Sequence, residues 1–167
     1  MTSTLKVQNI AHTGGTNAMT IDSSGRINQP AKPAFFAYLT VERSLSSISV
    51  NPIDITQYLT GIDYNIGSCY SAANGFVAPM DGIYTFSAGF YYYNAANAEY
   101  RVYKNNSIWQ RLPSSNIGTA NNPFTGNFTW HMQLSTNDAI KISMLSGNNA
   151  NLFHGNRNTF FCGYMVA

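Results

Sequence analysis

Apolar and polar residues alternate with a period of two along most of the chain, as in β-strands that bury one face. No window keeps the apolar spacing of an amphipathic helix for more than a turn or two. Short aromatic and β-branched runs are bounded by Gly, Pro and Asn, which is typical of a β-sandwich or barrel. The body of the chain is predicted to contain strands over 34–41, 48–50, 64–71, 82–93, 98–104, 107–112, 124–135, 138–146 and 157–166.

The links between these strands are of two kinds. Those at 72–75, 105–107 and 135–137 are short and contain Asn or Gly, which suit tight turns. Those at 94–97, 113–123 and 146–156 are polar and mostly longer. Because consecutive antiparallel strands reverse direction, we expect the longer loops at one pole of the sandwich. The tight turns and the C-terminus are then expected at the other pole.

The first 33 residues differ from the body at 34–167, and the two are predicted to be separate units. Strands are expected over Leu5–Ile10 and Ala18–Asp22, with Gly14 and Gly15 in the turn between them. Pro30 and Pro33 favour an extended spacer after them. A two-stranded hairpin is marginal by itself. The N-terminal segment is therefore predicted to pack against other copies or another protein, and to deliver the body with its loop-rich pole outward.

The strand at 82–93 is aromatic on both of its faces. Tyr84, Phe86, Ala88, Phe90 and Tyr92 alternate with Ile83, Thr85, Ser87, Gly89, Tyr91 and Tyr93. The first set is the predicted core lining. The second set includes two tyrosines too apolar for free exposure, so it is covered either by the chain itself or by another subunit. We favour a subunit contact.

Composition excludes several classes of protein. Only 10% of the 167 residues are charged, against about 25% in typical soluble domains. The 20 Asn, 16 Ser and 14 Thr supply polarity instead, and 23 aromatic residues can fill a core. The nine Lys and Arg are scattered, which argues against nucleic-acid binding. No apolar run is long enough to cross a membrane, and the first 15 residues lack the layout of a secretion signal.

No catalytic motif is present, and we expect a protein that is not an enzyme. His12, His131 and His154 are not grouped with a nucleophile or with one another, so no metal site is predicted, and no cofactor. His131 is expected at a strand edge or an interface. Cys69 and Cys162 lie in strand-like runs and are predicted to be buried free thiols.

Residues 65–86, "NIGSCYSAANGFVAPMDGIYTF", resemble the signature of the C1q/TNF-like globular domain. Its P-x-D-G-x-Y-x-F element is carried by Pro79, Asp81, Gly82, Tyr84 and Phe86. The stretches "VYKNNSIW", "LSTNDAIKI" and "TFFCGYMV" are also similar to that family, so the likeness covers residues 34–167. It implies a ten-stranded, all-β jelly-roll sandwich that assembles as a homotrimer around an aromatic-lined axis. Candidates for the trimer contact are Tyr91, Tyr93 and Tyr164.

The N-terminal segment, "STLKVQNIAHTGGTNAMTIDSSGRINQPAKPAF", is similar to openings of tail-fibre and other virion structural proteins of marine tailed bacteriophages. This resemblance implies a particle assembled in the host cytoplasm and released by lysis, without a secretion signal. Other virion proteins are then the expected partners of residues 1–33.

Asn-, Ser- and Gly-rich loops with an occasional aromatic residue are typical of recognition surfaces, and they suit host-envelope polysaccharide or lipopolysaccharide. The alternative is that they only keep the tip soluble. The candidate ligand-binding residues are Asn94, Asn97, Asn116, Asn121, Asn149, Asn151 and His154. Because domains of this family sometimes carry calcium, Asp54, Asp63 and Asp81 are the acids to inspect.

The expected function is that of a trimeric tail- or head-fibre protein that contacts the host envelope. A capsid-decorating trimer and a secreted C1q-like lectin are the alternatives.

Overall fold

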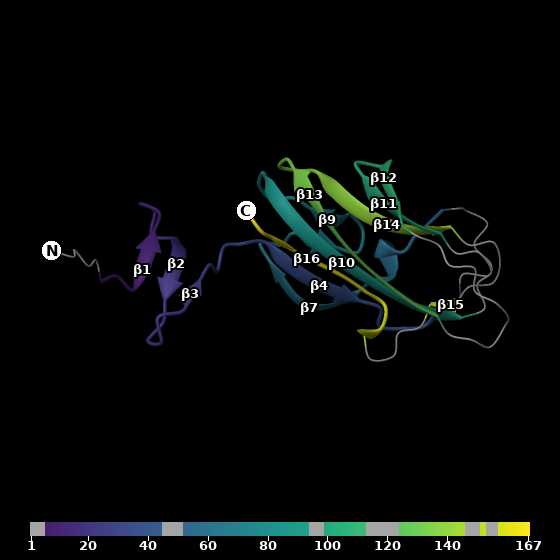
Figure 1. Cartoon of the computed structure of the whole chain (residues 1–167), viewed down its shortest axis with the longest axis horizontal. Coiled ribbons are helices and arrows are strands. Elements are labelled where there is room, and N and C mark those ends of the chain that lie inside the picture. The colour runs from purple at the N-terminus through teal and green to yellow at the C-terminus, as the bar shows by residue number, and fades with distance from the viewer. Residues whose placement is uncertain (1–5, 45–51, 94–98, 113–123, 146–150, 153–156) are drawn as a thin grey trace.

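The computed structural model describes residues 6–44, 52–93, 99–112, 124–145, 151–152 and 157–167 (Figure 1). It has a small N-terminal sheet joined by a short connection to a two-layered jelly-roll sandwich. The all-β prediction is confirmed. Helical structure in the described residues is limited to short 3-10 turns, such as η1 (Thr56–Tyr58). Within these residues, no helix is long and apolar enough to cross a membrane.

The N-terminal sheet has three strands, β1 (Asn9–Ala11), β2 (Asn17–Ile21) and β3 (Ile27–Asn28), where two were expected. The third strand forms because Asp22 closes a second tight turn. Its Oδ1 accepts hydrogen bonds from the backbone N–H of Ser24 and of Arg26, at 2.8 and 3.0 Å. Chain reversal at this turn brings β3 back alongside β2.

The larger layer of the sandwich is a seven-stranded sheet (Figure 1). Its strands are β4 (Ala34–Tyr38), β5 (Arg43–Ser44), β7 (Gly61–Ile66), β10 (Gly82–Tyr93), β13 (Phe124–Leu134), β15 (Asn151–Leu152) and β16 (Phe160–Met165). Strand β10 is central, because β13 pairs with one of its edges while β16 and β15 pair with the other. Strands β4 and β7 continue the sheet beyond β16.

The second layer has six strands, in the order β12, β11, β14, β9, β8, with β6 also paired to β14. They are β6 (Ile53–Asp54), β8 (Tyr70–Ser71), β9 (Gly75–Val77), β11 (Glu99–Lys104), β12 (Ser107–Leu112) and β14 (Ala139–Leu145). The body has more strands than the ten that the resemblance implied, because several are pieces of only two residues.

Aromatic rings fill the space between the two layers. Tyr84, Phe86, Ala88 and Phe90 of β10 are fully buried, as the alternation predicted. Phe90 stacks on Tyr100 of the second layer, with ring centroids 4.1 Å apart. The side chain of Tyr92 lies outside the described residues. Contacts between aromatic rings therefore join the two layers, and the alternation of side chains along β10 points these rings into the core.

The prediction of a single strand over 64–71 is wrong. Gly67 and Ser68 have φ of 78° and 50°, which breaks the run, so β7 ends at Ile66 and β8 starts at Tyr70 in the other sheet. The side chain of Asn65 bridges the break. Its Oδ1 accepts from the N–H of Tyr70 at 3.1 Å, and its Nδ2 donates to the C=O of Tyr70 at 2.8 Å. Positive φ at Ser68 is compatible with a turn but not with a strand.

The predicted pole geometry holds for most of the chain. The C-terminus, the start of β10 and the turns at 105–106 and 135–138 meet at one end, since Ile83 N–H donates to Ala167 O and Asn105 N–H to Ala139 O. We call this end the C-terminal pole. The N-terminal segment enters there, through a hydrogen bond from Met165 N–H to Pro33 O at 3.0 Å. The turn at 72–75 is an exception: it lies along the side of β14, where Lys141 Nζ bonds Ala73 O.

The strand ends that flank 94–98, 113–123 and 146–150 lie at the opposite pole, which we call the distal pole. Tyr92 pairs with Phe124 there, Glu99 with Leu145, and Tyr100 with Leu112. The loops themselves, and the strand expected at 48–50, lie outside the described residues.

Candidate subunit interface

The seven-stranded sheet turns one side toward the core and the other side away from it, and we call the latter the outward face. Cross-strand register arranges the side chains of this face in rows, because directly paired residues share a face. One row runs through His131, Thr85, Tyr164, Ala34 and Ile66. The next runs through Thr129, Ser87, Cys162, Phe36 and Tyr64.

The half of the outward face on β16, β4 and β7 is aromatic. The ring of Phe36 contacts those of Phe160, Tyr64 and Tyr38, with centroids 5.4, 6.3 and 6.3 Å away. Much of this surface is open to solvent: Tyr164 is 55% exposed, Tyr64 47% and Ile66 42%. A patch of large apolar side chains on a domain surface is typical of a protein contact.

The other half, on β10 and β13, is polar but neutral. Thr85 Oγ1 lies 2.8 Å from His131 Nδ1, and Ser87 Oγ lies 2.9 Å from Thr129 Oγ1. These hydroxyl and imidazole groups satisfy one another within the sheet. A partner that covers them therefore needs no opposite charge.

Phe160 lies flat across the sheet because β10 has a glycine beside it. A Cβ atom at Gly89 would overlap the Phe160 ring and the side chain of Asn127. This glycine of β10 therefore makes room for the Phe160 ring of β16. This places the Phe160 ring where it stacks on Phe36, at an interplanar angle of 13°.

Ionic groups lie at the rim of this face. Arg157 pairs with Asp63 at 2.8 Å, and its guanidinium lies over the Tyr38 ring, 5.0 Å from the centroid. Within the face, burial raises the pKa of the Cys162 thiol, and burial also raises the pKa of Tyr64. Both groups are accordingly neutral at pH 7, and the face carries little charge.

A second exposed apolar surface lies at one edge of the sandwich, on β12. Ile108 and Trp109 there are 44% and 42% exposed. Strand β12 ends the six-stranded sheet beside β11, and β11 lies over the β13 side of the other layer, where Tyr100 contacts Phe128 at 5.9 Å. The β12 edge is thus on the opposite side of the body from the β16–β4–β7 half of the outward face.

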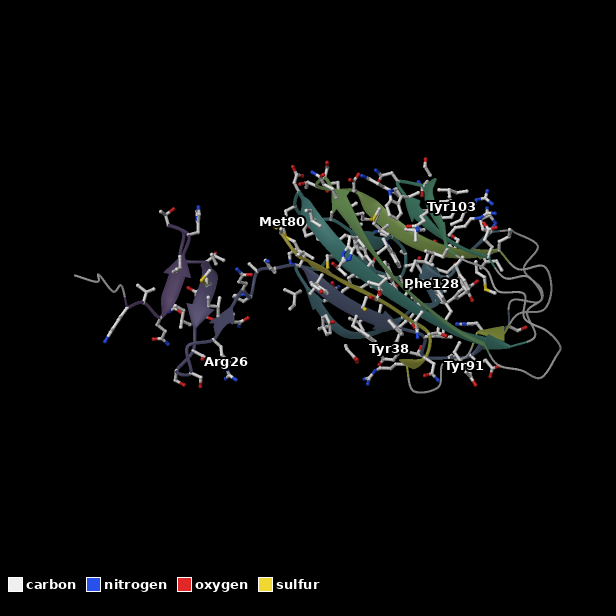
Figure 2. All side chains as sticks on the ribbon, in the orientation of Figure 1. Arg26, Tyr38, Met80, Tyr91, Tyr103 and Phe128 are labelled. Atoms are coloured by element: carbon white, nitrogen blue, oxygen red, sulfur yellow. The ribbon has the colours of Figure 1, made fainter. Side chains whose placement is uncertain are left out.

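The structure describes the side chains of two of the three predicted contact residues. Tyr91 and Tyr164 are both on the outward face, one toward each pole; Figure 2 shows Tyr91 near Tyr38, away from Tyr103 on the other layer. Tyr93 ends β10, and its side chain lies outside the described residues. Sequence reasoning missed Phe36, Tyr38, Tyr64 and Phe160. The alternation in "AFFAYL" could have revealed the first two, since burying Phe35, Ala37 and Leu39 leaves Phe36 and Tyr38 on the other side.

The candidate ligand-binding residues cannot be placed in the same way. Asn94, Asn97, Asn116, Asn121, Asn149 and His154 lie outside the described residues, and of Asn151 only the backbone, in β15, is described. The strand ends that lead into their segments gather at the distal pole.

The three acids considered for calcium are each engaged elsewhere. Asp54 pairs with Lys141 at 3.1 Å, Asp63 pairs with Arg157, and Asp81 accepts hydrogen bonds from the N–H and hydroxyl of Thr136. Among the described residues, no three His, Cys, Asp or Glu side chains group as metal ligands do. His12 is used within a turn, where its Nδ1 accepts from Gly14 N–H at 3.0 Å.

Both cysteines are free, as expected. Cys69 is buried, and desolvation raises the pKa of its thiol to about 11. Cys162 is only half-buried and is part of the outward face.

The sequence and the fold identify the class of protein. The profile of the C1q domain matches residues 34–166, and the chain belongs to this family. The family is one of structural and ligand-binding domains rather than of catalysts. None of the curated protein sequences matches the chain.

Solved structures share the fold at low sequence identity. Eiger TNF from S. frugiperda is 11% identical with a TM-score of 0.61, covering 82% of this chain and 94% of that one. The globular domain of zebrafish complement 1qA is 13% identical with a TM-score of 0.55, covering 81% and 98%. Murine APRIL is 12% identical with a TM-score of 0.60, covering 81% and 99%. At these identities the similarity establishes the jelly-roll fold alone.

Proposed function

We propose that three copies of this chain form a non-enzymatic, cofactor-free surface protein of a bacteriophage particle. In this proposal the N-terminal segment attaches the trimer to the particle, and the distal pole contacts polysaccharide of the host envelope. The observation that carries the proposal is the aromatic half of the outward face, centred on Phe36.

The positions of the two exposed apolar surfaces favour a ring over a two-fold dimer. One is a sheet face, around Phe36, and the other is the β12 edge, with Ile108 and Trp109. Because they are different surfaces on opposite sides of the body, a contact between them joins each copy to the next in the same direction. A contact between two different surfaces repeats until a ring closes. Three copies is the number that the family resemblance implies.

The direction of attachment follows from the two poles. The N-terminal segment joins the body at the C-terminal pole, whereas the strand ends that lead into the Asn-rich loops lie at the distal pole. A trimer held by its N-terminal segments thus turns the distal pole outward. The similarity of residues 1–33 to virion structural proteins supports a phage particle as the attachment site.

Truncation tests the attachment. Residues 34–167 should remain folded and trimeric by light scattering, but should no longer assemble onto particles that lack the native protein. A truncated chain that fails to fold would contradict the division at residue 33. A truncated chain that still assembles onto particles would contradict attachment through the N-terminal segment.

Competition tests recognition. The purified full-length trimer should reduce infection of host cells when added before the phage, and should bind host polysaccharide on a glycan array. A trimer that assembles onto particles but neither competes nor binds glycan would instead have the decorating role.

A further inference from the structure

The N-terminal sheet has two chemically different faces. The register pairs Ile10 with Met19 and Ile21 with Ile27, so these four apolar side chains share one face. Asn9, Thr20 and Asn28 share the opposite face, since Thr20 pairs with both asparagines. One face is therefore apolar and the other carries amides and a hydroxyl.

The shape of this sheet is set by its own turns. The turn after β1 is closed by a hydrogen bond from His12 N–H to Thr16 O at 2.9 Å, and the turn after β2 by one from Asp22 N–H to Arg26 O at 3.0 Å. Arg26 Nε also pairs with Asp22 Oδ2 at 2.7 Å (Figure 2 labels Arg26 at this turn). Local hydrogen bonds thus fix which residues lie on the apolar face.

Among the described residues, no second layer covers this sheet. In Figure 1 it stands apart from the body, and Ile10 and Ile27 are 47% and 62% exposed. Strands of two to five residues make a marginal sheet by themselves, and burial of the hydrophobic face is what would stabilise it. The apolar face therefore requires an occupant.

In the proposed trimer, the N-terminal sheets of the other two copies are close enough to cover this apolar face. This inference rests on the proposed trimer. The connection to the body leaves from β4, beside β16, where Lys32 Nζ also donates to Val166 O at 2.8 Å. These strands carry the aromatic half of the outward face, so ring closure brings three connections to one end of the assembly. The spacer at 29–33 reaches at most about 17 Å when extended. Such short tethers hold linked modules at roughly millimolar effective concentration.

The apolar surface of the body continues toward the N-terminal sheet. Tyr164 of β16 and Val166 just after that strand are exposed at the C-terminal pole, with Ile66 and Ile83 beside them. Apolar surface therefore extends along the assembly from the outward face toward the N-terminal segment.

We propose that the apolar faces of three N-terminal sheets pack against one another and form a second trimerisation unit at the C-terminal pole of the body. Ile10, Met19, Ile21 and Ile27 of each copy fill its interior. The faces with Asn9, Thr20 and Asn28 turn outward, and these are the surfaces left for contact with the particle.

Disulfide trapping in the full-length chain tests this arrangement. Cys69→Ala and Cys162→Ser remove the native thiols, and a single cysteine is then introduced as Met19→Cys or, in the matched control, as Thr20→Cys. The two positions are neighbours on β2 but lie on opposite faces. Mild oxidation should link Met19→Cys chains in pairs, up to two of every three chains, as a dimer band on a denaturing gel. Thr20→Cys should stay monomeric on the same gel.

Light scattering of the same samples separates the two levels of the proposal. A trimer in which Met19→Cys does not crosslink, or in which both variants crosslink equally, overturns the packing of the N-terminal sheets and leaves the body trimer standing. A monomer overturns the proposed trimer itself.

Discussion

The rings of Phe36 and Phe160 stack 5.4 Å apart on the outward face of the seven-stranded sheet, on neighbouring strands. We predict that Phe36→Ser, made in residues 34–167 without the N-terminal segment, separates the proposed trimer without unfolding the body. Truncating a central aromatic anchor costs about 2 kcal/mol or more, or about 30-fold in the dissociation constant. Light scattering across a dilution series should show monomers at concentrations where the wild type is trimeric, with an unchanged far-UV circular dichroism spectrum.

Met80→Ser is the matched control for this change. Met80 is also an exposed apolar residue, but it precedes β10 beside Asp81 and lies on neither the outward face nor the β12 edge (Figure 2). Met80→Ser should leave the mass of the trimer, as measured by light scattering, unchanged. If Phe36→Ser stays trimeric at the lowest concentration tested, the outward face is not the contact.

A ring built from two different surfaces makes a further prediction about mixtures. Phe36→Ser keeps an intact β12 edge, and Trp109→Ser keeps an intact outward face. Mixed together, the two variants can form one native contact between them, whereas the remaining contacts would each contain at least one altered surface. In residues 34–167, where the N-terminal sheets are absent, a tagged Phe36→Ser chain should therefore retain untagged Trp109→Ser chains, but not untagged Phe36→Ser chains.

The mass of the retained complex completes this test. It should be that of two chains. Retention of untagged Phe36→Ser chains to the same degree would mean that the contact does not depend on Phe36, and would contradict the face-to-edge ring.

Sequence periodicity predicted the long strands well for a physical reason. Strands at 82–93 and 107–112 agree with β10 and β12 at both ends, because strong turn residues bound a run that alternates throughout. The small strands were missed since long-range pairing alone defines them. Strand β6 is an example, where Ile53 pairs with Met144. No local pattern encodes such a partner.

The candidate interface was predicted only in part. The second face of β10 was recognised because Tyr91 and Tyr93 follow an otherwise regular alternation. Most of the aromatic surface is on β4, β7 and β16, and it becomes one patch only when the register aligns Phe160, Phe36 and Tyr64 across three strands. Register between strands distant in sequence is a tertiary property, and a single sequence does not reveal it.

Gly75 is predicted to be intolerant of any side chain. Its φ is 73°, and a Cβ atom there would overlap the carbonyl oxygen of Ile140 in β14. Gly67 offers a control with nearly the same φ, 78°, whose nearest atoms would be 3.7 Å away, on Pro33. Gly67→Ala should cost about 1 kcal/mol through backbone strain alone.

The cost of Gly75→Ala should exceed that of Gly67→Ala by at least about 1 kcal/mol, because the backbone of β14 must also move. Urea unfolding of both variants at one protein concentration measures the difference. Equal midpoints would mean that β9 and β14 accommodate the methyl group.

Asp138 should make stability depend on pH in the acid range. Its carboxylate accepts hydrogen bonds from Lys104 Nζ at 2.8 Å, and from Asn105 Nδ2 and Ser135 N–H at 2.7 Å each. The bond from Lys104 is the main cause that lowers its pKa to about 2, below the value of about 3.9 for an unfolded chain. The folded state therefore holds the proton less tightly, and the stabilisation is present above about pH 4 and lost as the pH falls toward 2.

The variant Asp138→Asn isolates this contribution. The wild type should exceed it in urea midpoint by a constant margin between pH 5 and 7, and the margin should shrink below pH 4 and vanish near pH 2. Lys104→Gln in the wild-type background should make the urea midpoint fall less between pH 5 and pH 2, because the strongest donor to the carboxylate is then removed. A margin that persists at pH 2 would mean that Asp138 stabilises the turn between β13 and β14 by packing rather than by charge.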